Sequence, residues 1–156
     1  MAALDNLKLR DVLAEVASGA LQLPDFQRNW KWDDDRIRAI IATVTLDYPL
    51  GVVMTLQTGG ATRFRSRTLT GARPEGDPKA ELLLLDGQQR LTSLFQALWL
   101  DAPVETSDSR GKSTERWYYV DIEKSVGPSA DRDEAILSVP ADKVSAPTST
   151  ARWSWI

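Results

Sequence analysis

Residues 82–98 read LLLLDGQQRLTSLFQAL and combine two strong patterns of apolar residues. Its four consecutive leucines predict a central strand that is buried on both faces. Leu91, Leu94, Phe95 and Leu98 then recur at helical spacing and predict an amphipathic helix. Only Asp86 and Gly87 separate the leucines from the glutamines that follow. The stretch therefore predicts a strand that passes through a tight turn directly into a helix.

The flanking sequence predicts further elements of both kinds. Leu9, Val12, Leu13 and Val16 recur at helical spacing and predict a helix that stops at Gly19. Three aspartates predict the start of a second helix near Asp33, because negative charge there complements the helix dipole. Strands are expected over residues 52–56 and 117–122. Residues 23–32 are expected to form a structured loop, 59–79 a solvated hairpin, 106–113 a mobile loop and 125–134 an irregular segment.

The composition bounds the class of protein. With 156 residues, 42% of them apolar and 26% charged, the chain is expected to form one globular domain. The sequence contains no cysteine and no histidine, which excludes a thiolate nucleophile, a histidine base and an HNH-type nuclease centre from this segment. The net charge of -3 gives no global attraction for nucleic acid, although a local arginine patch can still bind it.

Location and chain length give three further expectations. No signal peptide or long apolar run opens the chain, so we expect a cytoplasmic protein without a membrane partner. The sequence ends on the apolar run Trp153-Ser154-Trp155-Ile156. Natural ends are usually polar, and we therefore expect the chain to be cut from a longer protein.

The junction between the leucine strand and its helix has residues suited to a phosphate group. Free N–H groups and the helix dipole at a helix start favour anions, and Arg90 adds a forked, permanent positive charge. Asp86 is suited to hold Mg²⁺ through water, to orient an attacking water or to contact a ribose hydroxyl. Gln88 and Gln89 supply amides and Thr92 a hydroxyl near the first turn.

A structural role explains the same residues equally well. Asp86 followed three residues later by Gln89 fits a capping box, Gly87 allows a tight turn, and Arg90 can pair with a surface carboxylate. The segment is neither a Walker A loop nor a dinucleotide fingerprint, since the required glycines and lysine are missing. The residues alone leave both interpretations open.

A second segment, LPDFQRNWKW at residues 23–32, combines aromatic rings with Gln, Arg and Lys. Such residues suit nucleic acid, because cations neutralise phosphates, Gln reads base edges and flat rings pack on sugars or bases. The alternative is that Phe26, Trp30 and Trp32 fill the core beneath a loop. Arg63, Arg65 and Arg67 would share one face of a strand, either as part of the solvated hairpin or as a track for phosphates.

Together the two segments resemble the N-terminal domain of GmrSD restriction endonucleases, within a ParB/sulfiredoxin-like group. The resemblance covers roughly residues 9–98, and YYVDIEK at residues 118–124 also fits. It implies an α+β domain with a small mixed sheet flanked by helices. It also implies a single domain over residues 1–156, followed in the full-length protein by an HNH-type nuclease domain.

The resemblance implies that the DGQQR segment binds and hydrolyses a nucleoside triphosphate, GTP or ATP. The catalytic candidates are Asp86, Gln88, Gln89 and Arg90, and Gly87 and Thr92 complete the nucleotide-binding set. Mg²⁺ is the expected cofactor, with Asp86 as its candidate ligand.

The family's Pro-x-(Tyr/Phe)-Gln-Arg segment corresponds here to Pro24, Phe26, Gln27 and Arg28. In SspE-like, phosphorothioate-sensing members this neighbourhood is implicated in recognising modified DNA. Phe26 stands where tyrosine is common, and an apolar pocket would favour a sulfur-substituted phosphate because it is less hydrated. The predicted DNA-binding set is Pro24, Phe26, Gln27, Arg28, Trp30 and Lys31.

These inferences predict an NTP-hydrolysing sensor of modified DNA that regulates the nuclease domain of an anti-phage restriction protein. One alternative is a DNA-binding module that uses the nucleotide only as a switch, without significant turnover. Another is a small-molecule phosphotransferase on the same fold, against which the arginine row argues mildly.

Overall fold

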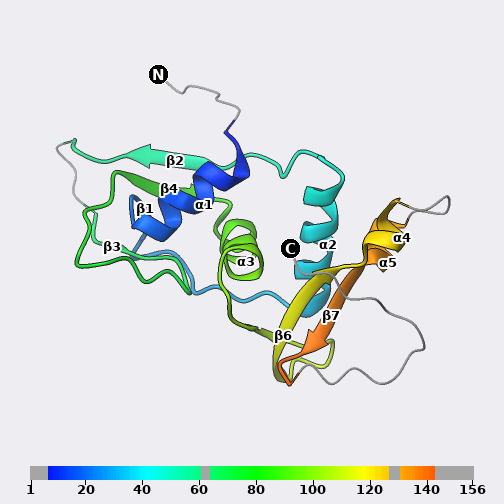
Figure 1. Cartoon of the computed structure of the whole chain (residues 1–156). Coiled ribbons are helices and arrows are strands. Elements are labelled where there is room, and N and C mark those ends of the chain that lie inside the picture. The colour runs from blue at the N-terminus through cyan, green and yellow to red at the C-terminus, as the bar shows by residue number, and fades with distance from the viewer. Residues whose placement is uncertain (1–6, 61–63, 127–130, 143–156) are drawn as a thin grey trace. The chain divides into compact units, whose positions relative to one another are not determined.

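The structure is a computed structural model that describes residues 7–60, 64–126 and 131–142. The chain divides into two compact units, one made of residues 1–30 and 52–95 and the other of residues 31–51 and 96–156. The boundary after Phe95 falls inside α3 (Gln88–Leu98). Both units contain helices and strands (Figure 1), which confirms the predicted α+β class.

The first unit is built on a small mixed sheet. Its strands are β1 (Leu21–Pro24), β2 (Met54–Gln57), β3 (Ser66–Arg67) and β4 (Leu82–Asp86), in the order β2-β4-β1-β3. β1 and β4 run parallel, whereas β2 pairs with β4 and β3 pairs with β1 in antiparallel fashion. The leucine run therefore forms a central strand, as predicted, although only its middle residues Leu83 and Leu84 are fully buried.

α1 (Leu9–Ser18) is the helix that was predicted to stop at Gly19. Its apolar residues Leu13 and Val16 are buried, and the helix ends at Gly19, whose φ of 78° lies in the left-handed region that glycine adopts easily. The segment after β3 is less solvated than expected, because Leu69 and Ala72 belong to the core of this unit.

The second unit contains the remaining elements. A three-stranded antiparallel sheet runs in the order β5 (Val104–Ser107), β6 (Ser113–Val120) and β7 (Ile136–Pro140). Its helices are α2 (Asp34–Thr45), α4 (Ile122–Val126) and α5 (Arg132–Ala135). The second helix was predicted, and it begins as expected, with Asp33 as its N-cap accepting a hydrogen bond from the Arg36 amide at 2.9 Å.

Two expectations for this unit are wrong. Residues 106–113 are not a mobile loop, because they form the end of β5, a turn and the start of β6. Asp108 orders that turn by accepting hydrogen bonds from the amides of Arg110 and Lys112, both at 2.9 Å. The segment 125–134 is not wholly irregular, since α4 ends and α5 begins within it.

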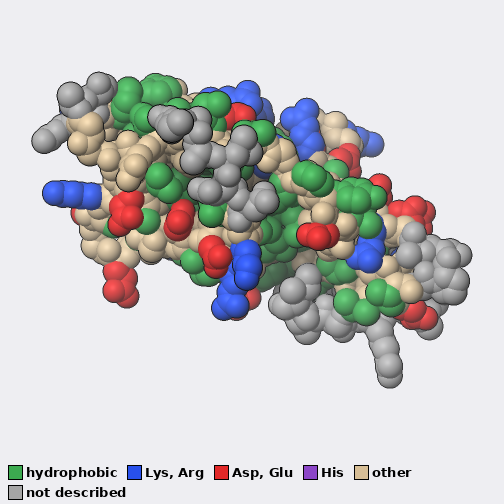
Figure 2. Space-filling model, turned by 90° about the horizontal axis from the view of Figure 1, so that it is seen from above, with side chains coloured by type: hydrophobic (Ala, Val, Ile, Leu, Met, Phe, Trp, Pro, Cys, Tyr) green, Lys and Arg blue, Asp and Glu red, His purple; other side chains and the backbone are tan. Residues whose placement is uncertain are grey.

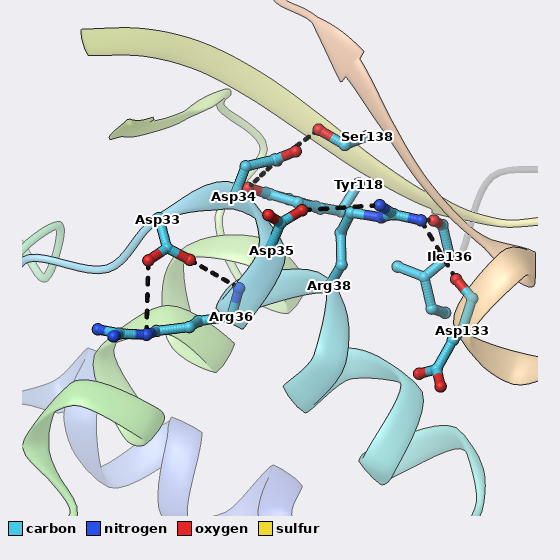
Figure 3. Close-up of polar contacts among 9 residues, drawn as sticks. All are labelled: Asp33, Asp34, Asp35, Arg36, Arg38, Tyr118, Asp133, Ile136 and Ser138. Carbon is cyan, nitrogen blue, oxygen red and sulfur yellow. Dashed lines mark hydrogen bonds and ion pairs between the residues drawn. The ribbon is translucent and has the colours of Figure 1, made fainter. Parts of the chain in front are cut away.

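The start of α2 is tied to the antiparallel sheet by polar contacts (Figure 3). The Asp34 carboxylate accepts a hydrogen bond of 2.9 Å from the Tyr118 hydroxyl on β6 and one of 2.5 Å from the Ser138 hydroxyl on β7. Arg38, one turn further along α2, donates from Nε to the carbonyl oxygen of Ile136 at 3.0 Å. These bonds fix the helix to both strands.

Two further expectations concern a membrane-spanning segment and the apolar C-terminal run. Among the described residues, no helix has both the length and the apolar character needed to cross a bilayer. The apolar run Trp153–Ile156, by contrast, lies outside the described residues.

We predict that Tyr118→Phe destabilises the chain at neutral pH and flattens its alkaline denaturation. Loss of a hydrogen bond to a carboxylate costs about 1.5–3 kcal/mol. Burial, and then the Asp34 carboxylate, raise the pKa of Tyr118 above its ordinary value of 10.0. Above about that pH the unfolded chain loses the phenolic proton while the folded chain keeps it, so the free energy of unfolding falls as pH rises.

Urea denaturation of the wild-type chain and of Tyr118→Phe between pH 8 and 11 measures both effects. Tyr48→Phe is the control, because Tyr48 is 61% exposed. Identical alkaline slopes in the wild type and Tyr118→Phe would contradict the assignment.

Candidate functional site at the start of α3

The turn between β4 and α3 requires a glycine. β4 ends at Asp86, α3 begins at Gln88, and Gly87 between them has a φ of 95°. A Cβ at this position would lie 3.2 Å from Val53 Cγ2 and 3.5 Å from Arg90 Nη2. Gly87 therefore combines a left-handed backbone with a close approach to two side chains.

Asp86 and Arg90 form an ion pair at the surface of this turn. Arg90 Nη2 lies 3.7 Å from Asp86 Oδ2, and the two side chains are 29% and 70% exposed, respectively. The same Arg90 nitrogen donates a hydrogen bond of 2.7 Å to the carbonyl oxygen of Val52. The guanidinium is thus held in place from one side, while the carboxylate remains largely in solvent.

Asp86 and Gln89 do not form the capping box that the sequence offered as an alternative. Within the described part of the chain, Arg90 is the only polar partner of the Asp86 carboxylate. Gly87, not Asp86, is the residue directly before α3, and its carbonyl oxygen accepts a hydrogen bond of 2.9 Å from the Leu91 amide. The Asp86 carboxylate therefore does not cap the helix.

The two glutamines of the motif bind the loop that follows β1. Gln88, only 5% exposed, donates from Nε2 to the carbonyl oxygen of Arg28 at 2.8 Å. Gln89 donates from Nε2 to the carbonyl oxygen of Asn29 at 3.3 Å. In the opposite direction, Gln27 of the loop donates from Nε2 to the carbonyl oxygen of Leu85 at 2.8 Å. The two predicted segments are thus joined directly, about sixty residues apart in sequence.

Arg67 has a role that the sequence did not predict. Its Nη2 donates to the carbonyl oxygens of Gln27 at 3.0 Å and Arg28 at 3.2 Å. The side chain therefore supports the loop instead of lining a phosphate track. Arg65 is exposed, and Arg63 lies outside the described residues. This function depends on the pairing of β1 with β3, for which the sequence holds no local signal.

The remaining predicted DNA-binding residues differ in accessibility. Phe26 is 65% exposed and Arg28 is also exposed, whereas Pro24 is fully buried at the end of β1. Trp30 is half-buried and donates from Nε1 to the Ser93 hydroxyl at 3.0 Å. Lys31 is exposed and is the first residue of the second unit. Phe26 is thus not a core residue, contrary to the packing alternative.

Thr92, the remaining nucleotide-binding candidate, is fully buried within α3. Its hydroxyl oxygen has no hydrogen-bond partner among the described residues. A nucleotide contact through Thr92 would require this hydroxyl to become exposed.

On the face that Figure 2 shows, acidic and basic side chains are interspersed and do not form one basic field. Among the described residues, no group of three or more acidic or histidine side chains could hold a metal ion. A magnesium ion at Asp86 would therefore need oxygen ligands from a phosphate group and water, which is how Mg²⁺ is commonly bound with one or two carboxylates.

A strand–turn–helix junction joined to an aromatic, arginine-containing loop on a small mixed sheet defines this α+β domain. The model of the GmrSD restriction endonuclease N-terminal domain matches residues 9–143, and the chain belongs to this family. This membership confirms the family resemblance of its two motifs.

One curated relative is an uncharacterized protein of Methanocaldococcus jannaschii, MJ0686. It is 30% identical over 146 residues, which are 88% of this chain and 24% of the relative. The chain thus spans about a quarter of the length of that protein.

We predict that Gly87→Ala destabilises the chain more than Gly59→Ala does. Both glycines have positive φ values, 95° and 106°, so each substitution costs about 1–2 kcal/mol of backbone strain. Only at Gly87 would the new methyl group meet neighbouring atoms, whereas nothing lies within 4 Å of a Cβ at Gly59. We expect an extra loss of about 1 kcal/mol or more in the free energy of unfolding, measured by chemical denaturation. Equal losses would show that Val53 and Arg90 do not constrain the turn.

Proposed function

We propose that this chain is an NTP-binding and NTP-hydrolysing domain that senses modified DNA and regulates a nuclease domain in a longer restriction protein. The observation that carries the proposal is the largely exposed Asp86 carboxylate beside the immobilised Arg90 guanidinium at the first turn of α3. Family membership supplies the restriction context.

The triphosphate would bind at the start of α3. The first N–H groups of a helix have no intrahelical partners and favour anions. Arg90 adds a guanidinium that its bond to Val52 orients in advance, so that less side-chain freedom is lost on binding. Its ion pair with Asp86 is an exposed one of small energetic value, which a phosphate oxygen can replace.

Asp86 would bind Mg²⁺ and orient the attacking water. A single exposed carboxylate fits a Mg²⁺ ion that takes its other ligands from the nucleotide and from water. When bound, the ion would neutralise charge on the phosphate groups. Gln89, half-buried at the surface, is the second candidate for orienting an attacking water.

DNA would contact the exposed side of the loop after β1. Arg28 supplies a positive charge for the phosphate backbone, and the exposed Phe26 ring supplies an apolar surface. A phosphorothioate is less hydrated than a phosphate, so it loses less on contact with such a ring. This difference would favour modified DNA.

The glutamine hydrogen bonds would connect the two sites. Gln88 holds the carbonyl of Arg28, and Gln27 holds the carbonyl of Leu85 next to Asp86. A ligand that shifts the start of α3 would therefore also shift the loop that carries Phe26 and Arg28. Nucleotide and DNA would then affect each other's affinity, as linkage requires.

A second candidate is a nucleotide-switched DNA-binding module without significant turnover. The observation that favours it is the burial of Gln88, whose amide nitrogen is already used by Arg28. With Gln88 engaged, hydrolysis would depend on Asp86 and Gln89, and a site with so few catalytic groups suits binding alone.

We predict that Asp86→Asn abolishes turnover without abolishing nucleotide binding. Asparagine keeps the shape of the side chain but removes its negative charge, and with it the preferred ligand for magnesium. Phosphate release from GTP and ATP with Mg²⁺ should fall by about 100-fold or more. Nucleotide affinity without magnesium should stay the same or rise, because a charge that repels phosphates is gone.

Arg90→Ala should instead weaken nucleotide binding itself, and Asp11→Asn on α1 serves as the matched control for Asp86. Phosphate release and nucleotide affinity are measured for the wild-type chain and for each variant, with plain and with phosphorothioate-bearing duplexes. Normal turnover in Asp86→Asn or Arg90→Ala would show that the site is assigned wrongly. A wild-type chain that binds nucleotide but releases no phosphate would favour the switch module.

A further inference from the structure

We propose that Phe26 and Phe64 form a platform that binds the flat face of an unpaired nucleic-acid base, a specific DNA contact that rests on the proposed function. The two rings lie with their centroids 5.9 Å apart and their planes at 68°. They are 65% and 43% exposed, respectively. Phe64 lies outside the segment that the sequence assigned to DNA.

The sheet places these two rings opposite each other. β1 and β3 pair with Leu23 opposite Arg67 and Pro24 opposite Ser66. The amide of Asp25 then donates to the carbonyl oxygen of Arg65 at 2.9 Å, which extends the pairing by one step. Phe26 and Phe64 are the next residues beyond this hydrogen bond, and their rings contact each other edge to face.

The platform is held before any ligand arrives. Arg67 binds the carbonyl oxygens of Gln27 and Arg28, directly after Phe26. Gln27 is in turn bonded to the carbonyl oxygen of Leu85 on the central strand. A ligand would therefore meet an aromatic pair whose backbone is already fixed, which lowers the entropy lost on binding.

Two adjacent, exposed aromatic rings offer a flat apolar surface to a ligand, and the neighbouring charges favour a nucleic acid. Arg28 and Arg65 are both exposed and flank the pair in sequence, while Asp25 is the one acidic residue between Pro24 and Arg28. Rings for bases beside cations for phosphates are the combination that binds single strands. Bases in a duplex are stacked on each other, so only an unpaired or extruded base can offer its face.

The test is binding of fluorescent single-stranded 12-mers to the whole chain, compared with a duplex of the same sequence. A third probe carries an abasic site at its centre. We expect the intact single strand to bind more tightly than the abasic one. Phe26→Ala and Phe64→Ala should each weaken its binding by about 5- to 100-fold, the effect of losing one stacked base. Phe64→Trp should restore affinity, since a larger ring also stacks.

Leu56→Ala is the matched control and should bind like the wild type. Leu56 is an apolar side chain, 40% exposed, on β2 at the opposite edge of the same sheet. Circular dichroism of each variant verifies folding. Equal affinity for the intact and abasic strands, or unchanged single-strand binding in both alanine variants, would overturn the platform.

Two outcomes separate this proposal from the proposed function. If the chain binds duplex through Arg28 but Phe64→Ala changes nothing, the platform is wrong and the DNA-sensing function stands. If the wild-type chain binds neither strand nor duplex at low salt, both fail. If the alanine variants change only the oligomeric state in light scattering, the aromatic pair is a protein contact and the platform is again overturned.

Discussion

The hydrogen bond from Gln88 Nε2 to the carbonyl oxygen of Arg28, 2.8 Å long, joins the strand–turn–helix junction to the loop after β1. A loop leaves main-chain carbonyl groups without strand partners, and such groups need a donor when they are shielded from water. Gln88 and Arg67 supply two donors to this one carbonyl. The position of the loop, and of every side chain it presents, depends on these contacts with elements far away in sequence.

The residues of the DGQQR motif therefore fall into two groups, those that support the backbone and those that are available to a ligand. The buried Gln88 holds the backbone, and Gly87 provides a turn that no residue with a side chain fits without displacing a neighbour. Arg90 is held by its hydrogen bond to the Val52 carbonyl oxygen, and the Asp86 carboxylate beside it is largely exposed. Chemical groups carried by rigid elements are held more accurately than groups on free loops, which would suit the proposed nucleotide site.

The sequence predicted the parts of this architecture that depend on local pattern. β4, α1, α2 and α3 follow from apolar spacing, helix-capping residues and glycine, all of which act within a few residues. In the second sheet only the later half of β6 was predicted as a strand; β5, the start of β6 and β7 were not, because their pairing is long-range. The same limit explains Arg67 and Phe64, whose partners are set by the register between β1 and β3. Thr92 was placed near the ligand from its position in the motif, but the face of α3 on which it lies is buried.

The hydrogen bonds between the two segments predict that nucleotide and DNA binding are coupled. Affinity for a non-hydrolysable GTP analogue would be measured with and without phosphorothioate duplex, in the wild-type chain and in Gln88→Met, which keeps the volume but removes the donor. In the wild type, DNA should change nucleotide affinity by about fivefold or more. In a folded Gln88→Met chain, this factor should fall towards one while each ligand still binds alone. Coupling of unchanged size in that variant would contradict the claim that these hydrogen bonds connect the two sites.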